Sequence, residues 1–579
     1  MHLKHSRTLA AAITAIAALG LAGCSDSDND HEEPAPQQPP PVAQLPRLSP
    51  AVGATLGNCT GLATRINIPD TTITAANEIA AGTLTVAGKP VAAHCQVLGQ
   101  MFRRVSPVDN KSYAIGFEMR LPVNWNGRFF YQANGGVDGS VATAAGPVGG
   151  GGPLDNALNQ GFAVISSDAG HGAPTPFFGI DPQARLDYGY QAVAKLTPMA
   201  KSLIQVAYGK APDRSYIGGC SNGGRHTMVV AARYAEQYDG YLAGNPGYRL
   251  PLAALANIAG AKTYASLAST PGDLPTGFTQ AERALVSNAV LGKCDALDGA
   301  ADGLIQDTWA CQTAFSLERD VPTCSGERNG SCLSAAQKTG IAALFAGAKT
   351  ESGKAIYTSF PYDAGLATNG WASWKFGAPI DRDSGAVAFI WAVPPEDPAT
   401  FNGRDFVLNA NLDSLLARIN ATNATYTESG TSFMTPPNGA NLSTLKNRGA
   451  KMLVYHGTSD PIFSSDDTTS WYEALRSANG GDASNFARYF RVPGMNHCSG
   501  GPSTDQFDML TPLVNWVEKG QAPDSVLASA RGAGNAGGAN ADLPATWSAT
   551  RTRPLCPYPK VARYKGSGNV EDAANFSCQ

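Results

Sequence analysis

The sequence contains little charge and no excess of either sign. Only 16% of its 579 residues are charged, whereas about a quarter are charged in an average soluble domain. The 43 Lys and Arg nearly balance the 47 Asp and Glu, which excludes the basic surface that nucleic acids or anionic membranes require. After residue 23 the sequence also lacks any apolar run of about eighteen residues, which excludes a later transmembrane helix. The length allows three or four domains, or one large unit with an insertion.

The first 23 residues are typical of an export signal. Two basic residues precede an apolar stretch from Leu9 to Leu21, which is too short to span a bilayer. Small residues then precede Cys24, as in a bacterial lipobox, where the cysteine is acylated; an ordinary cleaved signal is the alternative. Residues 24–48, acidic and then rich in Pro and Gln, predict a disordered tether. We therefore expect an exported bacterial protein, anchored to the outer membrane through Cys24 or free in the periplasm or medium.

Cysteine is plentiful, and its number is odd. Acylation of Cys24 would leave ten of the 11 cysteines, which should form five disulfides in an exported protein. Sequence alone does not fix the connectivity. Short separations favour three local pairs, a fourth pair would close the N-terminal region, and elimination leaves one pair that is far apart in the chain. These pairs are Cys294–Cys311, Cys324–Cys332, Cys556–Cys578, Cys59–Cys95 and, by elimination, Cys220–Cys498.

Ser221 lies in the sequence context of a nucleophile elbow. The short apolar run 215–219 predicts a strand, and the pattern through Tyr234 predicts a helix directly after the serine. Gly219 and Gly223 flank the serine two residues away on each side, so the chain can turn sharply and expose Oγ. A structural glycine turn is the alternative, but the strand and helix on either side favour a nucleophile.

A serine nucleophile needs a base, and the sequence has only 8 histidines. His497 follows the predicted strand 487–491, near the end of the chain, which fits the order serine, acid, histidine of α/β-hydrolases. His2 and His5 lie in the signal and His31 in the tether. The positions of His94 and His226 favour structural roles, His171 could lie near a site without being the base, and His456 ends the predicted strand 451–455.

The acid should lie between the serine and the histidine, in a loop after a strand. Asp460 follows the predicted strand 451–455 and could hold the imidazole in the required tautomer. Asp466 and Asp467 are rivals, but they begin a helical pattern and are better explained as caps. Cys220 directly precedes the proposed nucleophile and Cys498 directly follows the proposed base. A disulfide between them would therefore fix the two catalytic loops to each other.

The order Cys-Ser, Asp and His-Cys resembles that of the tannase/feruloyl esterase family. Segments 492–502, 508–514 and 553–559 are similar to the same family and, within it, to the bacterial hydrolases of mono(2-hydroxyethyl) terephthalate (MHET). The resemblance runs from about residue 50 to the end. It implies an α/β-hydrolase fold with a large inserted lid, and five disulfides that match the pairs above. We expect hydrolase segments 49–250 and 445–579, with a lid at 251–444 where Pro, Gly, Asn and Trp increase.

The resemblance implies a serine carboxylic ester hydrolase without an organic cofactor, acting on esters of aromatic acids. MHET is the first substrate expected, giving terephthalate and ethylene glycol, and feruloyl or galloyl esters are the alternative. An oxyanion hole needs two N–H groups; we assign those of Gly136, with Gly135 as its rival, and Asn222. An acidic residue replaces Asn222 in the resembled MHET hydrolase, although the N–H is the same. A non-catalytic lipoprotein that binds aromatic ligands is a remote alternative, and we expect a monomer.

Two features of the predicted lid suggest ligands. An Asp-rich and Gly-rich loop suits Ca²⁺, and the resembled family holds a structural calcium there, through residues that match the side chains of Asp295, Asp298 and Asp302 and the carbonyls of Ala300 and Leu304. A solvated turn is the alternative. Aromatic residues also gather in the lid and suggest a wall for a flat ring; Trp374 matches the ring-packing tryptophan of the family. Arg382 could pair with a substrate carboxylate, although an exposed surface arginine is the better interpretation. The other members of the wall are Trp371, Phe376, Phe389 and Trp391.

Overall fold

The structure is a computed structural model that describes residues 45–147, 149–150 and 155–579. The predicted signal, Cys24 and most of the predicted tether lie outside the described residues. The end of that tether, residues 45–48, is folded rather than disordered. Leu45 and Leu48 pack against the hydrophobic core, and Arg47 donates a hydrogen bond to the carbonyl of Lys519. Two leucines in an otherwise polar stretch explain why the folded unit begins at residue 45.

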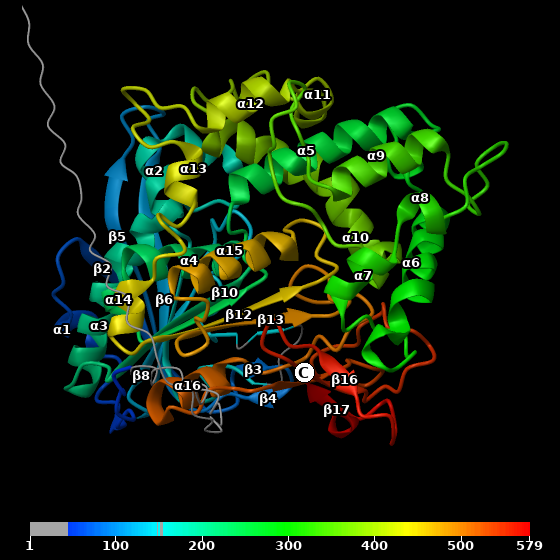
Figure 1. Cartoon of the computed structure of the whole chain (residues 1–579). Helices are drawn as coiled ribbons and strands as arrows, with labels where there is room; N and C mark the ends of the chain where they lie inside the picture. Colours follow the sequence, from blue (N-terminus) through cyan, green and yellow to red (C-terminus); the bar gives the residue numbers. More distant parts are fainter. Residues whose placement is uncertain (1–44, 148, 151–154) are drawn as a thin grey trace, which may run out of the picture. The chain divides into compact units, whose positions relative to one another are not determined.

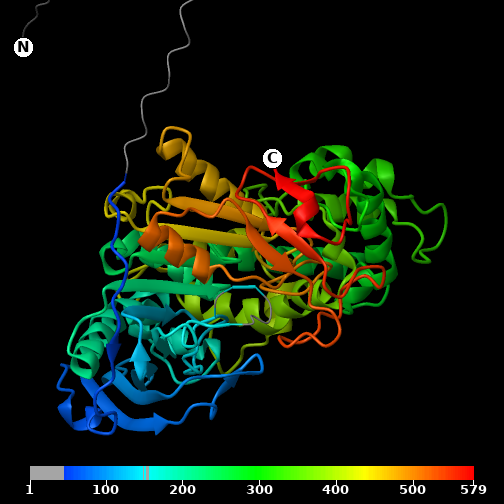
Figure 2. The ribbon, with the colours of Figure 1, turned by 90° about the horizontal axis from the view of Figure 1, so that it is seen from below.

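A nine-stranded sheet forms the centre of the folded unit (Figures 1 and 2). Its order is β13-β12-β11-β10-β8-β9-β6-β5-β2, parallel from β13 to β9 and antiparallel from β9 to β2. Figure 1 shows helices α4 and α15 above the parallel strands and α16 below them. The strands are β2 (Thr71–Ile79), β5 (His94–Val105), β6 (Ser112–Pro122), β8 (Arg128–Gln132), β9 (Ala163–Ser167), β10 (Arg214–Cys220), β11 (Gly240–Gly244), β12 (Lys451–Gly457) and β13 (Ala487–Val492).

The parallel strands are short and mostly buried, because helices cover them. Gly209, with a φ of 75°, ends α3, and the side chain of Ser464 caps α15 by accepting the N–H of Asp466. The helices outside the insertion are α1 (Leu62–Arg65), α2 (Pro182–Leu186), α3 (Ala192–Tyr208), α4 (Asn222–Arg233), α15 (Ser465–Ala478) and α16 (Leu510–Lys519).

A long insertion separates β11 from β12 and contains helices but no strand longer than an isolated bridge. It contains the segment 251–444 that was predicted as a lid. Capping boxes begin two of its helices, at Thr279 with Glu282 and at Ser334 with Gln337. Its helices are α5 (Leu250–Leu267), α6 (Gln280–Cys294), α7 (Thr308–Ala314), α8 (Leu317–Asp320), α9 (Ala335–Phe345), α10 (Asn369–Ala372), α11 (Gly403–Leu408), α12 (Leu412–Ile419), α13 (Gly430–Met434) and α14 (Ser443–Asn447).

Short antiparallel pairs complete the fold. Figure 2 shows the C-terminal strands, in red, beside the green helices of the insertion. The pairs are β1 (Ala54–Thr55) with β7 (Asn124–Trp125), β3 (Thr85–Val86) with β4 (Lys89–Pro90), β14 (Val526–Ser529) with β15 (Thr552–Leu555), and β16 (Ala562–Tyr564) with β17 (Phe576–Cys578).

Five disulfides are present, and they join the five pairs of cysteines expected from the sequence. Cys220–Cys498 closes the longest loop, with a sequence separation of 278. This number of disulfides is consistent with an exported protein, since they persist in oxidising compartments. Within the described ranges, no helix has both the length and the apolar character needed to cross a membrane.

Candidate active site

Ser221 occupies a sharp turn between β10 and α4. Its φ of 67° and ψ of −126° lie in a region that non-glycine residues rarely adopt. The turn is so tight that only glycine fits on either side of the serine, since a Cβ on Gly219 would lie 2.1 Å, and one on Gly223 2.2 Å, from the carbonyl oxygen of Ala133. The N–H of Ser221 donates to the carbonyl of Gly244 on β11 at 2.9 Å. The elbow predicted from the sequence is therefore built, and it presents the hydroxyl at the carboxyl end of β10.

Ser221, His497 and Asp460 form a chain of hydrogen bonds. His497 Nε2 lies 2.8 Å from Ser221 Oγ, and His497 Nδ1 lies 2.8 Å from Asp460 Oδ2. A carboxylate can only accept, so Nδ1 carries a proton and Nε2 is free to receive the proton of the serine. The three side chains come from loops after β10, β12 and β13, which end at the same edge of the sheet.

The environment of Asp460 keeps its carboxylate charged. Burial alone would raise the pKa of Asp460, but the neighbouring rings of His497 and His456 hold it well below its usual range. Oδ1 accepts the N–H groups of Ile462 and Phe463 at 2.9 and 3.1 Å. An anion with this many donors is suited to orienting His497 and stabilising the imidazolium that forms during catalysis.

The rival acids have other partners. Asp467 pairs with Arg249, and Asp466 accepts the hydroxyl of Ser359. Both lie in the first turn of α15, whose cap is Ser464 rather than either aspartate. Since neither is hydrogen-bonded to His497, the geometry favours Asp460.

The other described histidines lie in hydrogen-bonded, buried positions. His94 contacts Arg120 and His226 contacts Asp138. His171 stacks on Phe178 with 3.6 Å between ring centroids, and His456 lies between Thr468 and the carbonyl of Phe463. These contacts agree with the structural roles expected for His94 and His226, and His171 also contacts the carbonyl of Val137, next to Gly136.

The Cys220–Cys498 disulfide joins the elbow to the loop that carries the base. Its Cα atoms are 6.1 Å apart, and each cysteine is next in sequence to a member of the hydrogen-bonded triad. Cys498 has a φ of 63°, so the chain turns immediately after His497. The disulfide thus limits how far Ser221 and His497 can separate.

A cavity of about 480 Å³ opens beside Ser221. Gly135, Gly136 and Asn222 line it. Among the residues that the structure describes, none accepts a hydrogen bond from the N–H of Gly136 or of Asn222. Both N–H groups are therefore available to an oxyanion formed at a carbonyl bound beside Ser221.

Two of the five aromatic residues expected to form a wall line this cavity. The rings of Trp374 and His497 lie 4.9 Å apart in an edge arrangement, and Trp391 also lines the cavity. The other three are packed against other aromatic side chains and do not line the cavity. The sequence pattern could not separate buried lid residues from those that line the cavity. They are Trp371, which contacts Phe278 and Phe376; Phe376 itself, which also contacts Tyr264; and Phe389, which contacts Phe177 and Phe401.

Arg382 is exposed, as expected, but it also lines the catalytic cavity. Its guanidinium lies 4.7 Å from the ring centroid of Trp374. Phe463, 5.2 Å from His497 between ring centroids, is a lining residue that sequence reasoning missed. Its position three residues after Asp460, in the same loop, could have indicated that it lies near the active site.

The Asp-rich loop of the insertion is satisfied mainly by protein partners. The carboxylate of Asp295 accepts the N–H groups of Asp302, Gly303 and Leu304. Asp302 forms an ion pair with Arg553. Within the described part of the chain, no three His, Cys, Asp or Glu side chains are grouped as metal ligands.

One carboxylate of that loop lacks a full set of partners. Asp298 Oδ2 is buried without a hydrogen bond, while Oδ1 accepts the N–H of Ala300 at 2.9 Å. Burial and the nearby charges of Asp302 and Asp295 raise the pKa of Asp298 to about 7. An unpartnered oxygen among like charges fits a cation chemically, so calcium at this loop stays a prediction.

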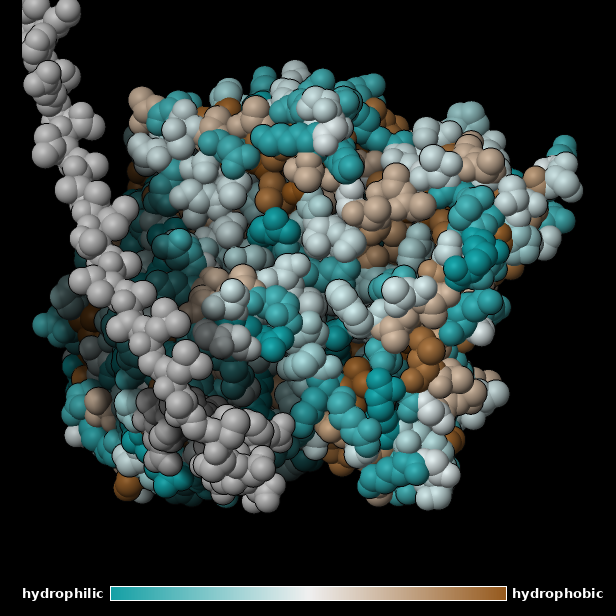
Figure 3. Space-filling view, in the orientation of Figure 1, coloured by the Kyte–Doolittle hydropathy of each residue, from teal (hydrophilic) through white to brown (hydrophobic). Residues whose placement is uncertain are grey.

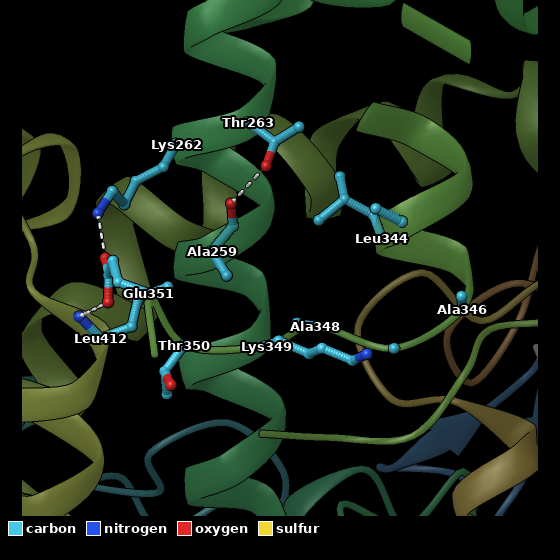
Figure 4. A pocket seen from close by; sticks show the side chains of 12 residues that line it. Ala259, Lys262, Thr263, Leu344, Ala346, Ala348, Lys349, Thr350, Glu351 and Leu412 are labelled. Atoms are coloured by element: carbon cyan, nitrogen blue, oxygen red, sulfur yellow. Dashed lines mark hydrogen bonds and ion pairs between the residues drawn. The ribbon is translucent and has the colours of Figure 1, made fainter. Parts of the chain in front are cut away.

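A second cavity, of about 500 Å³, lies against α5 in the insertion (Figure 4). Two of its charged side chains are paired with the protein: Lys262 Nζ lies 2.9 Å from Glu351 Oε1, and Glu351 Oε2 accepts the N–H of Leu412. It contains no nucleophile and base in contact, so the chemistry belongs to the cavity beside Ser221.

The fold and this site define a carboxylic ester hydrolase built on the α/β-hydrolase fold. Residues 95–579 match the family described as tannase and feruloyl esterase. The chain belongs to that family.

Individual relatives agree with this assignment. A mono(2-hydroxyethyl) terephthalate hydrolase from Piscinibacter sakaiensis is 40% identical over 84% of each chain. A probable feruloyl esterase B-1 from Neosartorya fischeri is 28% identical over 80% of this chain and 82% of its own. The crystal structure of feruloyl esterase B from Aspergillus oryzae superposes with a TM-score of 0.70 at 24% identity, over 90% of this chain and 99% of the other, and so shares the fold.

Proposed function

We propose that the protein hydrolyses esters of aromatic carboxylic acids, and that MHET is its substrate, cleaved to terephthalate and ethylene glycol. The observation that carries the proposal is the chain of hydrogen bonds from Asp460 through His497 to Ser221, which opens into a cavity beside Trp374. The 40% identical MHET hydrolase supports the choice of substrate.

In the proposed mechanism, Ser221 Oγ attacks the ester carbonyl while His497 Nε2 takes its proton across 2.8 Å. The N–H groups of Gly136 and Asn222 hold the oxyanion. His497 then protonates the departing alcohol, and an acyl-enzyme remains on Ser221. Water, deprotonated by the same histidine, attacks that ester, and His497 returns the proton to Ser221 Oγ as the acid departs. Asp460 stabilises the imidazolium in both halves of the reaction.

The cavity offers separate contacts for the ring and for a distal carboxylate. Trp374 and Phe463 each contact the ring of His497 in an edge arrangement, and both line the cavity, where they could hold a flat ring near Ser221. Arg382 makes no ion pair or hydrogen bond with the described residues, so its donors are free for a carboxylate.

Arg382→Ala should raise KM for MHET by up to about fivefold, since a charge pair at an exposed site contributes up to about 1 kcal/mol. The KM for methyl ferulate, which has no carboxylate, should stay within about twofold by the same reasoning. Steady-state kinetics of wild type, Arg382→Ala and Arg382→Lys on MHET, methyl ferulate and methyl gallate would measure both. Equal losses on all three esters would exclude a carboxylate contact. A wild type that prefers methyl ferulate or methyl gallate would instead support the alternative suggested by the feruloyl esterase relatives.

We also propose that Ca²⁺ binds the loop of Asp295, Asp298 and Asp302, with the carbonyls of Ala300 and Leu304. The buried, unpartnered Asp298 Oδ2 supports this. Calcium at one hundred times its Kd should add about 2.7 kcal/mol of stability. Calorimetry in EDTA and in excess calcium would show this as a higher Tm with calcium, and Asp298→Asn should reduce the difference. The same Tm in both buffers would contradict the proposal.

We further propose that Cys24 is acylated, so that a tether holds the folded unit at a membrane surface. The small residues before Cys24 support this. We propose that the folded unit is a monomer. On the face shown in Figure 3, hydrophobic residues lie in small groups among hydrophilic ones, without one broad apolar patch.

A further inference from the structure

Gly136 borders open space in the cavity, and hydrogen bonds hold the backbone around it. Gly136 has a φ of 64°, and a Cβ built on it would meet no atom within 4 Å. Its carbonyl accepts a hydrogen bond from the hydroxyl of Tyr188 at 3.2 Å. The preceding peptide unit is held as well, since the N–H of Asp138 donates to the carbonyl of Gly135 at 3.3 Å. The carbonyl of Gly135 and the N–H of Gly136 belong to the same peptide unit. This hydrogen bond therefore restrains the plane of the peptide that supplies the proposed oxyanion donor.

The same Tyr188 is connected to the second oxyanion donor. The backbone carbonyl of Tyr188 accepts Arg225 Nη2 at 3.0 Å, and Arg225 Nε donates to Asn222 Oδ1 at 2.6 Å. Arg225 Nη1 also donates to the carbonyl of Gly189 at 2.8 Å. A single buried guanidinium therefore spans from the residue that supports Gly136 to the side chain of Asn222.

Asn222 closes the circuit. Its Nδ2 donates to Asp138 Oδ2 at 2.9 Å, while its Oδ1 faces Arg225. Asp138 Oδ2 also lies 3.0 Å from His226 Nε2. The amide thus has a carboxyl group at its nitrogen end and a guanidinium at its oxygen end, and this fixes its orientation. Arg225 is 0% exposed and Asn222 and Tyr188 are 1% exposed, and hydrogen bonds strengthen in such surroundings.

We propose that Tyr188, Arg225 and the Asn222 side chain are positioning residues that hold the two oxyanion donors in register. The circuit runs Gly136, Tyr188, Arg225, Asn222, Asp138 and back to Gly135. It couples two loops that follow different strands, β8 and β10. Preorganised donors stabilise charge in the transition state without rearranging during the reaction. This role rests on the proposed esterase function.

Tyr188→Phe removes the hydroxyl and keeps the ring. With p-nitrophenyl acetate as the probe, rapid mixing should show an acylation rate about tenfold below wild type, a fraction of the 10² to 10³ that loss of a whole oxyanion donor costs. The burst amplitude and KM should change little, because the oxyanion forms in deacylation as well and the two steps should slow together. Tyr208→Phe is the matched control. That buried hydroxyl also donates to a backbone carbonyl, of Pro122 at 2.7 Å, and its removal should leave the rate within about twofold.

A second variant guards against failure of the first to fold. Asn222→Ala keeps the backbone N–H and removes both side-chain bonds of the circuit, so its acylation rate should also fall by about tenfold or more at full amplitude. A Tyr188→Phe or Asn222→Ala rate within twofold of wild type would overturn the proposal, as would a reduced amplitude at an unchanged rate, which indicates a purely structural role. Failure of the esterase function itself is distinguishable, because wild type would then show no burst and would match Ser221→Ala.

Discussion

Ser221→Ala should lower kcat/KM for every ester that the protein hydrolyses by at least about 10⁴-fold. The hydroxyl lies 2.8 Å from His497 Nε2, and alanine has no atom that can attack or form the acyl-enzyme. The fold should survive, because the backbone N–H and not the side chain holds the turn to Gly244. Substrate should still bind, so the variant should trap it with a Kd similar to that of wild type.

Turnover of MHET by purified Ser221→Ala, followed by chromatography of terephthalate, measures this loss. Ser287→Ala is a suitable control. Its hydroxyl is also buried, donating to the carbonyl of Ala364 at 2.6 Å, but it lies in the insertion away from the triad. The control should keep the activity of wild type. Hydrolysis by Ser221→Ala within about a hundredfold of wild type would mean that another group is the nucleophile.

The double variant Cys220→Ser, Cys498→Ser should lose both stability and turnover. The bond closes a loop with a sequence separation of 278. The chain-entropy relation gives about 5.6 kcal/mol for a loop of this length, an upper figure because four other disulfides already restrict the unfolded chain. We expect kcat per folded molecule to fall at least about a hundredfold, since a 1 Å displacement between reacting groups costs this much. Denaturant unfolding and kinetics in the cold, where the variant is most folded, would separate the two effects.

Cys324→Ser with Cys332→Ser is the matched control. That disulfide has a sequence separation of only 8 and lies in the insertion. The same relation gives about 2.5 kcal/mol, and kcat should not change. A Cys220 and Cys498 variant with the full kcat of wild type would show that the link is not needed for catalysis. Loss of kcat in both variants would point to general destabilisation.

The triad could be predicted because each of its members follows a short buried strand and has a local signature. Gly219 and Gly223 around Ser221 and the loop position of Asp460 are features of the sequence itself, and the structure brings these residues together with His497. The neighbouring cysteines added a long-range restraint that few sequences offer.

Other parts of the site depend on tertiary packing that no local pattern encodes. Trp371 and Trp374 are three residues apart, yet Trp371 is buried in the insertion and Trp374 lines the catalytic cavity. Tyr188 and Arg225 carry no sequence signature for supporting an oxyanion loop, since their role requires that two loops meet. The predicted end of the tether at residue 48 was wrong for a related reason. Leu45 and Leu48 are too few to form a periodic pattern in the sequence, but both pack against the hydrophobic core.

Because the insertion lies between β11 and β12, the Cys220–Cys498 disulfide joins the chain before the insertion to the chain after it. Residues 220 to 498 form a covalent ring that contains the whole insertion. A protease that cuts one peptide bond inside this ring opens it without dividing the molecule. Ser221 would stay attached to one side of the disulfide and His497 to the other, so that the nucleophile and its base remain joined even when the backbone between them is cut.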